Sequence, residues 1–271
     1  MVMTEIRQLS SECVGEPANR SRGKRLMKPD ITADARCAFD VIKTGGSCIF
    51  PVDVGYTFVG GSQEALLRIF HAKGRGTHKR NAMVGDLAIH DEVHMMDARS
   101  REMVRTITVG YDLPLGVIAP FRPEHPLIRA LHPDSLSGST EGDTLAMLVN
   151  AGPFHAEMCR LSRNETHPLF GSSANLTGSG TKFRVQDIQK ELTAIADHIV
   201  DYGLRKYHLY RRSATLIDFS SMEVVRVGAC YELIQDVLLR HYGVELPPDP
   251  GLERVPSGHL RETQRHKTDE A

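Results

Sequence analysis

Apolar side chains recur along the chain in alternating helical and strand-like patterns. Residues 32–44 carry them at positions 35, 38, 39 and 42, the spacing of one helical face, and Gly45-Gly46 ends the pattern. The apolar run 47–52 is typical of a buried strand. Ser62 is a suitable N-cap for a second helix, which is predicted to run through His71.

The rest of the chain continues this alternation. Further strands are predicted at 82–89, 115–119, 145–149, 168–173, 197–200, 214–219 and 222–227. Further helices are predicted at 99–107, 126–132, 153–163, 184–195 and 229–242. Short strands that alternate with helices predict a single α/β domain with a layered fold, over residues 31–243.

Polar segments flank this domain, and both are predicted to be flexible tails. Residues 1–30 lack any period and contain a basic cluster at positions 20–28 that could touch RNA, although a solvated tail is the simpler interpretation. Residues 244–271 are almost entirely polar and contain Pro247-Pro248-Asp249-Pro250.

Composition narrows the function only slightly. The 271 residues carry a net charge of −1, which argues against a chain-wide polyanion binder but leaves room for a local basic pocket. No run of about eighteen apolar residues predicts a membrane span, and the absence of an apolar signal core favours the cytoplasm. The five scattered cysteines are expected to be reduced, and His90 and His94 to lie on a solvated helix start without zinc.

Two loops carry the candidate chemistry. The segment 73–80 gathers four cations around two glycines, namely Lys73, Arg75, Lys79 and Arg80. The segment 171–178 offers hydroxyls, an amide and two glycines, including Ser172, Ser173 and Asn175. Glycines let the backbone approach an anion closely, while hydroxyls and backbone N–H groups donate to it. A cationic loop together with a hydroxyl-rich loop is what a polyphosphate such as ATP requires.

The two loops resemble those of the YrdC-like family, which includes the threonylcarbamoyl-AMP synthases. Lys73, Arg75 and Lys79 match its Lys-x-Arg-x-x-x-Lys pattern, and residues 173–178 match its Ser-Ala-Asn-x-Ser-Gly pattern with Thr177 as the second hydroxyl. The weaker matches are the segment 50–56 and a closing pair of strands that contains Arg226. The resemblance covers residues 32–242, in the right order and spacing.

This resemblance implies a twisted mixed sheet, flanked by helices, with a concave ligand face. It implies the joining of threonine, bicarbonate or CO2, and ATP into threonylcarbamoyl-AMP with release of pyrophosphate, for the modification of tRNA. Mg²⁺ would be held through the phosphates. The implied ATP-binding residues are Lys73, Arg75, Lys79, Ser172, Ser173, Asn175 and Arg226, with Arg75 and Lys73 as catalytic residues. The implied amino-acid pocket consists of Val52, Asp53, Val54 and Tyr56.

The chain departs from the family pattern at several of these positions. Val52 and Val54 replace two threonines, Gly116 replaces another, and Leu148 stands where the family has an arginine. The lost cation could be replaced by one of four arginines, Arg160, Arg184, Arg211 or Arg212. Two alternatives therefore stay open: carbamoyl-adenylate chemistry on a different amine, or an inactive relative that binds a nucleotide or RNA.

Overall fold

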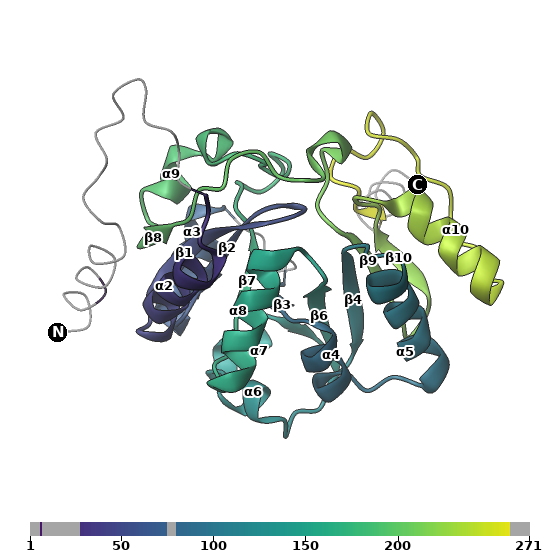
Figure 1. Ribbon diagram of the computed structural model, residues 1–271, viewed down its shortest axis with the longest axis horizontal. Coiled ribbons are helices and arrows are strands. Elements are labelled where there is room, and N and C mark those ends of the chain that lie inside the picture. The colour runs from purple at the N-terminus through teal and green to yellow at the C-terminus, as the bar shows by residue number, and fades with distance from the viewer. Residues whose placement is uncertain (1–5, 7–27, 75–79, 261–271) are drawn as a thin grey trace, which may run out of the picture.

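The computed structural model describes residue 6, residues 28–74 and residues 80–260 of the chain. Ten strands from this part of the chain form one mixed sheet in the order β10-β9-β4-β6-β3-β7-β2-β1-β8, with β5 paired to β6 (Figure 1). Neighbouring strands are antiparallel at β1/β2 and parallel at β4/β9. The predicted mixed α/β sheet with flanking helices is confirmed.

The elements have the following bounds. The strands are β1 (Ser47–Val52), β2 (Gly55–Gly60), β3 (Ala82–Val84), β4 (Leu115–Pro120), β5 (Thr140–Glu141), β6 (Thr144–Val149), β7 (Phe170–Ser173), β8 (His198–Ile199), β9 (Thr215–Asp218) and β10 (Glu223–Arg226). The α-helices are α2 (Ile31–Lys43), α3 (Gln63–Ala72), α4 (Leu87–Val93), α5 (Ala98–Arg105), α6 (Pro126–Arg129), α7 (Pro133–Ser137), α8 (Pro153–Asn164), α9 (Lys190–Thr193) and α10 (Tyr231–Tyr242). Short turns are η1 (Thr106–Gly110), η2 (Val185–Asp187) and η3 (His208–Tyr210).

Hydrophobic side chains on the two faces of β1 and β2 enter two separate cores. Phe50 and Val59 belong to the large cluster that α2 and α8 cover. Ile49 and Phe58 point to the other face and pack in a smaller cluster with Ile69 of α3. Both faces of these strands are thus buried, which explains why the apolar run at 47–52 does not alternate with polar residues.

The structure differs from the predicted elements in three places. The strand predicted at 82–89 ends at Val84, because the Asp86 side chain accepts a hydrogen bond from the Ile89 amide at 2.9 Å and starts α4 there. Strand β2 is absent from the predicted elements, because Gly55, Thr57 and Gly60 interrupt its apolar residues and leave neither an unbroken apolar run nor an alternation. The helix predicted at 184–195 is reduced to η2 and α9.

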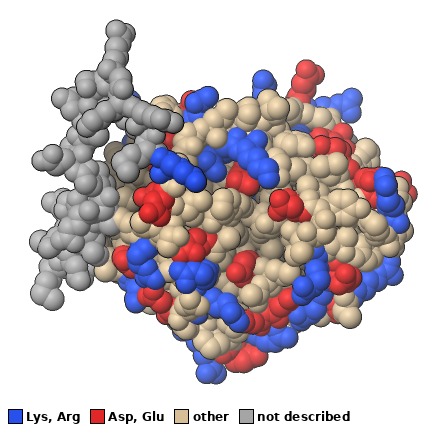
Figure 2. Space-filling model, viewed as in Figure 1, with Lys and Arg blue, Asp and Glu red and all other residues tan. Residues whose placement is uncertain are grey.

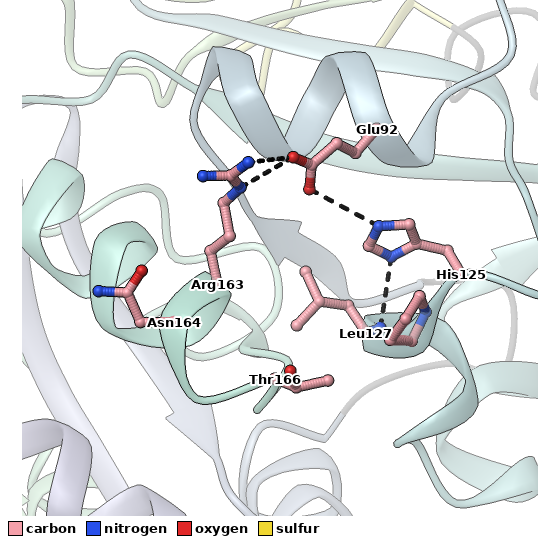
Figure 3. A pocket seen from close by; sticks show the side chains of 7 residues that line it. Glu92, His125, Leu127, Arg163, Asn164 and Thr166 are labelled. Atoms are coloured by element: carbon pink, nitrogen blue, oxygen red, sulfur yellow. Dashed lines mark hydrogen bonds and ion pairs between the residues drawn. The ribbon is translucent and has the colours of Figure 1, made fainter.

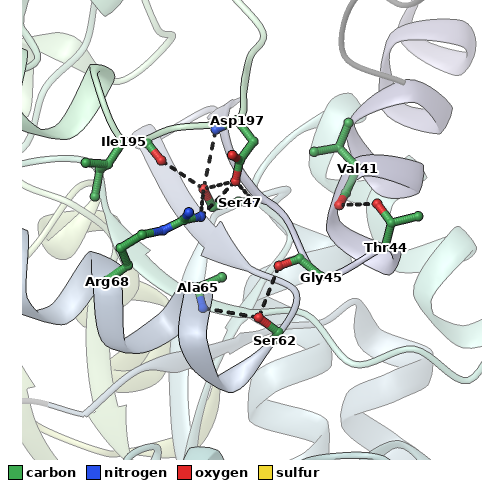
Figure 4. A network of polar contacts seen from close by, with 9 residues as sticks. All are labelled: Val41, Thr44, Gly45, Ser47, Ser62, Ala65, Arg68, Ile195 and Asp197. Carbon is green, nitrogen blue, oxygen red and sulfur yellow. Dashed lines mark hydrogen bonds and ion pairs between the residues drawn. The ribbon is translucent and has the colours of Figure 1, made fainter. Parts of the chain in front are cut away.

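A polar network ties β1 to α3 and to the segment that precedes β8 (Figure 4). The Asp197 carboxylate accepts hydrogen bonds from the Ser47 amide and hydroxyl, both at 2.8 Å. The Arg68 guanidinium donates to the same carboxylate oxygen at 2.8 Å. Four hydrogen-bonding groups from three segments therefore meet where β1 begins, and they fix its position against α3.

Residues 244–260 pack against the sheet, whereas the sequence predicts a flexible tail from residue 244. Leu246 and Val255 are buried. The Arg212 guanidinium holds this segment through an ion pair with Asp249 at 2.8 Å. Val227, which follows the edge strand β10, donates its amide to Gly258 O at 2.8 Å. The segment thus covers an edge that would otherwise expose unpaired backbone groups.

Two expectations about cysteine and histidine are wrong. Cys37 is disulfide-bonded, whereas Cys48, Cys159 and Cys230 are buried free thiols. His90 and His94 are buried rather than solvated, with their Nδ1 atoms 2.8 Å apart. Within the described residues there is no group of three or more histidine, cysteine or acidic side chains that could hold a metal ion. No helix in this part of the chain is long and apolar enough to span a membrane.

Three buried histidines should make the protein sensitive to acid. Burial lowers the pKa of His90 to about 4, of His94 to about 3 and of His155 to about 4, against an ordinary value of 6.5. They stay neutral in the native state, whereas the unfolded chain binds protons at these positions below 6.5. We expect the free energy of unfolding to fall as the pH drops from 6.5 toward 4.

Urea unfolding at about pH 7.5 and about pH 5 measures this effect. A His90→Leu/His94→Gln variant should lose less stability between the two pH values than the wild type does. His132→Gln, at an exposed position, serves as the matched control and should behave like the wild type. An identical pH dependence in the buried-pair variant and the wild type would contradict the assignment.

Candidate functional site

Lys73 joins the two loops that the sequence singles out. It is the C-cap of α3 and is only 5% exposed, although its side chain carries an ammonium group. Its Nζ donates to the Ser172 hydroxyl at 2.9 Å and also to the Ser173 carbonyl. The structure thus brings together Lys73, Ser172 and Ser173, as the sequence predicts. A positive charge at the point where the two loops meet would attract an anion such as a phosphate.

The loop after β7 closes on the same lysine. The Thr177 amide donates to Lys73 O at 3.1 Å. Asn175 is 8% exposed and its Nδ2 donates to Leu176 O, whereas its buried Oδ1 has no hydrogen-bond partner among the described residues. Gly171 lets β7 approach β2, because a Cβ there would lie 2.2 Å from Phe58 O. An unpaired buried acceptor is costly in a folded protein and is a frequent mark of a ligand site.

The other predicted phosphate-binding residues are distributed differently. Arg75 and Lys79 lie outside the described residues. Arg226 is on β10, and four strands separate β10 from β7 in the sheet order. Its Nε donates to Ala214 O at 2.9 Å, and burial lowers the pKa of Arg226 to about 10. No described carboxylate forms an ion pair with Arg226, so its charge is only partly compensated.

The predicted amino-acid pocket is built around the turn between β1 and β2. The Asp53 amide donates to Ala151 O at 2.7 Å, and Asp53 O accepts from the Tyr207 amide at 3.0 Å. Burial raises the pKa of the Asp53 carboxyl, an effect that Lys206 and Arg205 oppose. Gly152 lies directly against this carboxylate, since a Cβ there would come within 2.4 Å of Oδ1.

The three other residues of the predicted pocket are engaged in the fold. Val52 is 4% exposed and Val54 is 1% exposed, and both belong to the large hydrophobic core. Tyr56 is also 1% exposed. Its hydroxyl lies 2.9 Å from Gly203 O and accepts from the Tyr202 amide at 3.1 Å. Asp53 is therefore the residue of this group with polar atoms available to a ligand.

The Asp53 turn and the Lys73 cluster form one continuous region. The Ala174 amide, next to Ser173, donates to Tyr56 O at 2.8 Å. The Arg205 guanidinium lies over the Tyr56 ring, 6.0 Å from its centroid. The sequence does not identify Arg205 and Lys206 as site residues, because they match no motif and follow a stretch without regular structure. Their spacing of about 150 residues from Asp53 left no local signal.

A separate cavity of about 280 Å³ lies between α4, α6 and α8 (Figure 3). Its lining residues are Glu92, His125, Pro126, Leu127, Arg163, Asn164 and Thr166. An ion pair between Arg163 and Glu92 crosses it. None of the predicted site residues lines it, so it is distinct from the region around Lys73. Figure 2 shows acidic and basic side chains interspersed over one face of the molecule, without a large area of one sign.

The protein thus has an α/β fold, and the polar side chains of its candidate site lie on loops that connect the sheet to the helices. Residues 40–228 match the family model Sua5/YciO/YrdC, described as telomere recombination. The chain belongs to this family. No curated protein matches the chain.

Solved structures show the same fold at low identity. Sua5 of P. abyssi, crystallised with L-threonine, is 20% identical with a TM-score of 0.62 over 83% of this chain. The match spans only 61% of that Sua5 chain. A hypothetical protein of Streptococcus mutans is 16% identical with a TM-score of 0.65, over 77% of this chain and 92% of its own. E. coli YciO is 19% identical with a TM-score of 0.53, over 70% and 85% of the two chains.

The contact between Gly152 and Asp53 predicts a costly substitution. Gly152 has φ +98°, and an added Cβ would press on the Asp53 carboxylate. Gly152→Ala should lower the free energy of unfolding by roughly 1–3 kcal/mol and displace the β1–β2 turn. Gly142→Ala, at φ +61° with nothing within 4 Å of its Cβ, should cost less.

Thermal and urea unfolding of a double-mutant cycle tests the cause. The cost of Gly152→Ala should shrink when Asp53 is also replaced by alanine, because the clashing carboxylate is gone. Additive costs would show that the backbone conformation alone accounts for the loss.

Proposed function

We propose that this chain is an ATP-dependent synthase that forms a carbamoyl-adenylate of an amino acid, of the threonylcarbamoyl-AMP type. The amine takes up CO2, supplied as bicarbonate, as a carbamate. A carbamate oxygen then bonds to the α-phosphorus of ATP, and pyrophosphate leaves. Family membership supports this reaction class, and the product would serve tRNA modification.

The observation that carries the proposal is the convergence of Lys73, Ser172 and Asn175. A buried ammonium, a hydroxyl and an unpaired amide oxygen come from two loops about a hundred residues apart in the sequence. Nucleotidyl transfer needs little covalent help from the protein and depends on charge neutralisation and positioning. Lys73 is suited to neutralise phosphate charge, and the Ser172 hydroxyl to orient a phosphate oxygen.

Mg²⁺ would bind to the phosphates of ATP rather than to protein side chains, since it commonly binds phosphate oxygens and retains several waters. It would offset charge on the phosphates as pyrophosphate leaves. The chain's own part is to hold the ATP. Arg226, which forms no ion pair with a described carboxylate, is a further candidate for a phosphate contact from β10, four strands away from β7.

Replacing Lys73 or Ser172 should weaken ATP binding. Lys73→Met and Ser172→Ala are expected to raise the dissociation constant for ATP roughly tenfold or more, because each removes a charge-assisted hydrogen bond. Calorimetric titration of ATP measures this. Lys190→Ala, on the exposed surface of α9, is the matched control and should bind ATP like the wild type. Unchanged affinity in both site variants would refute the ATP site.

The amine is expected to be more apolar than threonine, or to bind with little preference for a hydroxyl. Val52 and Val54 offer no hydroxyl, and a site without a partner for a substrate hydroxyl discriminates poorly in its favour. Pyrophosphate release with ATP and bicarbonate should therefore be at least as fast with valine or 2-aminobutyrate as with threonine and serine. A preference for threonine of about a hundredfold or more would contradict this expectation.

A further inference from the structure

The carboxylate of Asp53 faces two cations without forming a short contact to either. Its Oδ1 lies 3.6 Å from an Arg205 Nη2, and its Oδ2 lies 3.8 Å from Lys206 Nζ. The Asp53 side chain is only 14% exposed. Both distances exceed that of a normal hydrogen bond. The two cations thus offset the charge of Asp53, and the three groups keep hydrogen-bonding capacity for another molecule.

Arg205 is held rigidly by its other nitrogens. Its Nε donates to Val52 O at 3.0 Å, and its Nη1 donates to Tyr202 O at 3.4 Å. Its guanidinium also lies above the Tyr56 ring. These contacts leave Nη2 directed toward Asp53, with the side chain 13% exposed. A preorganised donor of this kind loses little entropy when it binds an anion.

Lys206 adds a second cation, and its side chain is more exposed than that of Arg205. Its side chain is 52% exposed, and its Nζ lies 4.9 Å from the centroid of the Tyr207 ring. A hydrogen bond from its ammonium to Tyr207 raises the pKa of Lys206, so this group stays charged. With Asp53 contributing one negative charge, the cluster of Asp53, Arg205 and Lys206 has a net charge of about +1.

The Asp53 turn binds the segment that follows β6, the strand on which Leu148 stands in place of the family's arginine. Leu148 is three residues before Ala151, whose carbonyl binds the Asp53 amide at 2.7 Å. Two of the arginines that the sequence suggests as replacements are engaged elsewhere. Arg160 pairs with Glu157 on α8 at 2.6 Å, and Arg212 pairs with Asp249 at 2.8 Å. Arg205 lies beside Asp53, whose amide binds the segment that follows Leu148.

We propose that Arg205, assisted by Lys206, binds the carboxylate of the amino-acid substrate, while Asp53 accepts a hydrogen bond from its amino group. The proposal rests on the proposed function for the identity of the substrate class. Cations on one side and a carboxylate on the other complement the two charged ends of an α-amino acid. Arg205 thereby supplies the recognition that Leu148 cannot.

Matched ligands separate this role from a merely structural one. Threonine, valine and 2-aminobutyrate are each titrated by calorimetry beside their carboxamides, which keep the amine but lack the carboxylate. The proteins are the wild type, Arg205→Gln, Arg205→Lys and Arg129→Gln. Arg129 is an exposed arginine at the end of α6 and is the control.

We expect the wild type and Arg129→Gln to bind at least one acid about tenfold to a hundredfold more tightly than its amide. Arg205→Gln should abolish this preference, and Arg205→Lys should retain part of it. Thermal unfolding identifies any variant that fails to fold, in which case Arg205→Lys carries the comparison. Equal weakening of acid and amide would overturn the proposal, as would a wild type that binds none of the acids.

An ATP titration and a pyrophosphate assay on the same proteins keep the two proposals apart. Loss of the acid preference with intact ATP binding supports the role of Arg205. Amino-acid binding with this preference, but without ATP binding or pyrophosphate release, would refute the synthase and leave the carboxylate site standing.

Discussion

The turn between β1 and β2 is the constraint on which the rest of the site depends. At Asp53, the amide and the carbonyl bind two segments that lie far apart in the sequence, through Ala151 O and the Tyr207 amide. Because the carboxylate is largely removed from water, its charge would be expensive without nearby cations. Arg205 and Lys206 offset that cost, and Gly152 leaves the space that the carboxylate occupies. One residue thus fixes three segments relative to one another.

The Lys73 cluster depends on this arrangement. Strand β2 begins directly after the turn and pairs with β7 from Thr57↔Ser173 to Gly60↔Phe170. That pairing sets the position of Ser172, whose hydroxyl accepts a hydrogen bond from the Lys73 ammonium. A buried lysine keeps its charge only where oxygen atoms replace its hydration. The ammonium is therefore bound and oriented by the fold itself, before any ligand is present.

Helix α8 links the Asp53 turn to the separate cavity. Its first turn follows Gly152 beside the Asp53 carboxylate, and its last turn carries Arg163 and Asn164 at the cavity. Twelve residues of helix span roughly 18 Å. Helix α8 packs closely on α2, and the Phe154 ring near its start contacts Phe50 of β1 with centroids 5.5 Å apart. The helix is therefore a rigid side wall that holds Gly152 in place.

Local signals in the sequence determined most of the elements and the pairing of two loops. The helical stripe at residues 32–44 agrees closely with α2, and the apolar run at 47–52 is β1, because burial of one or both faces leaves a pattern in nearby residues. The cations around Lys73 and the hydroxyls around Ser173 likewise marked the two loops, each from its own residues. Each of these signals is contained in a short segment.

Tertiary structure decided what no short segment encodes. Strand β2 is buried on both faces and lacks a period, so only its partners β1 and β7 define it. The sequence predicts solvated His90 and His94 because acidic residues surround them, yet the fold turns both side chains inward. Arg205 reaches Asp53 from about 150 residues away, and contacts over such separations depend on the packing of the whole sheet rather than on local propensity.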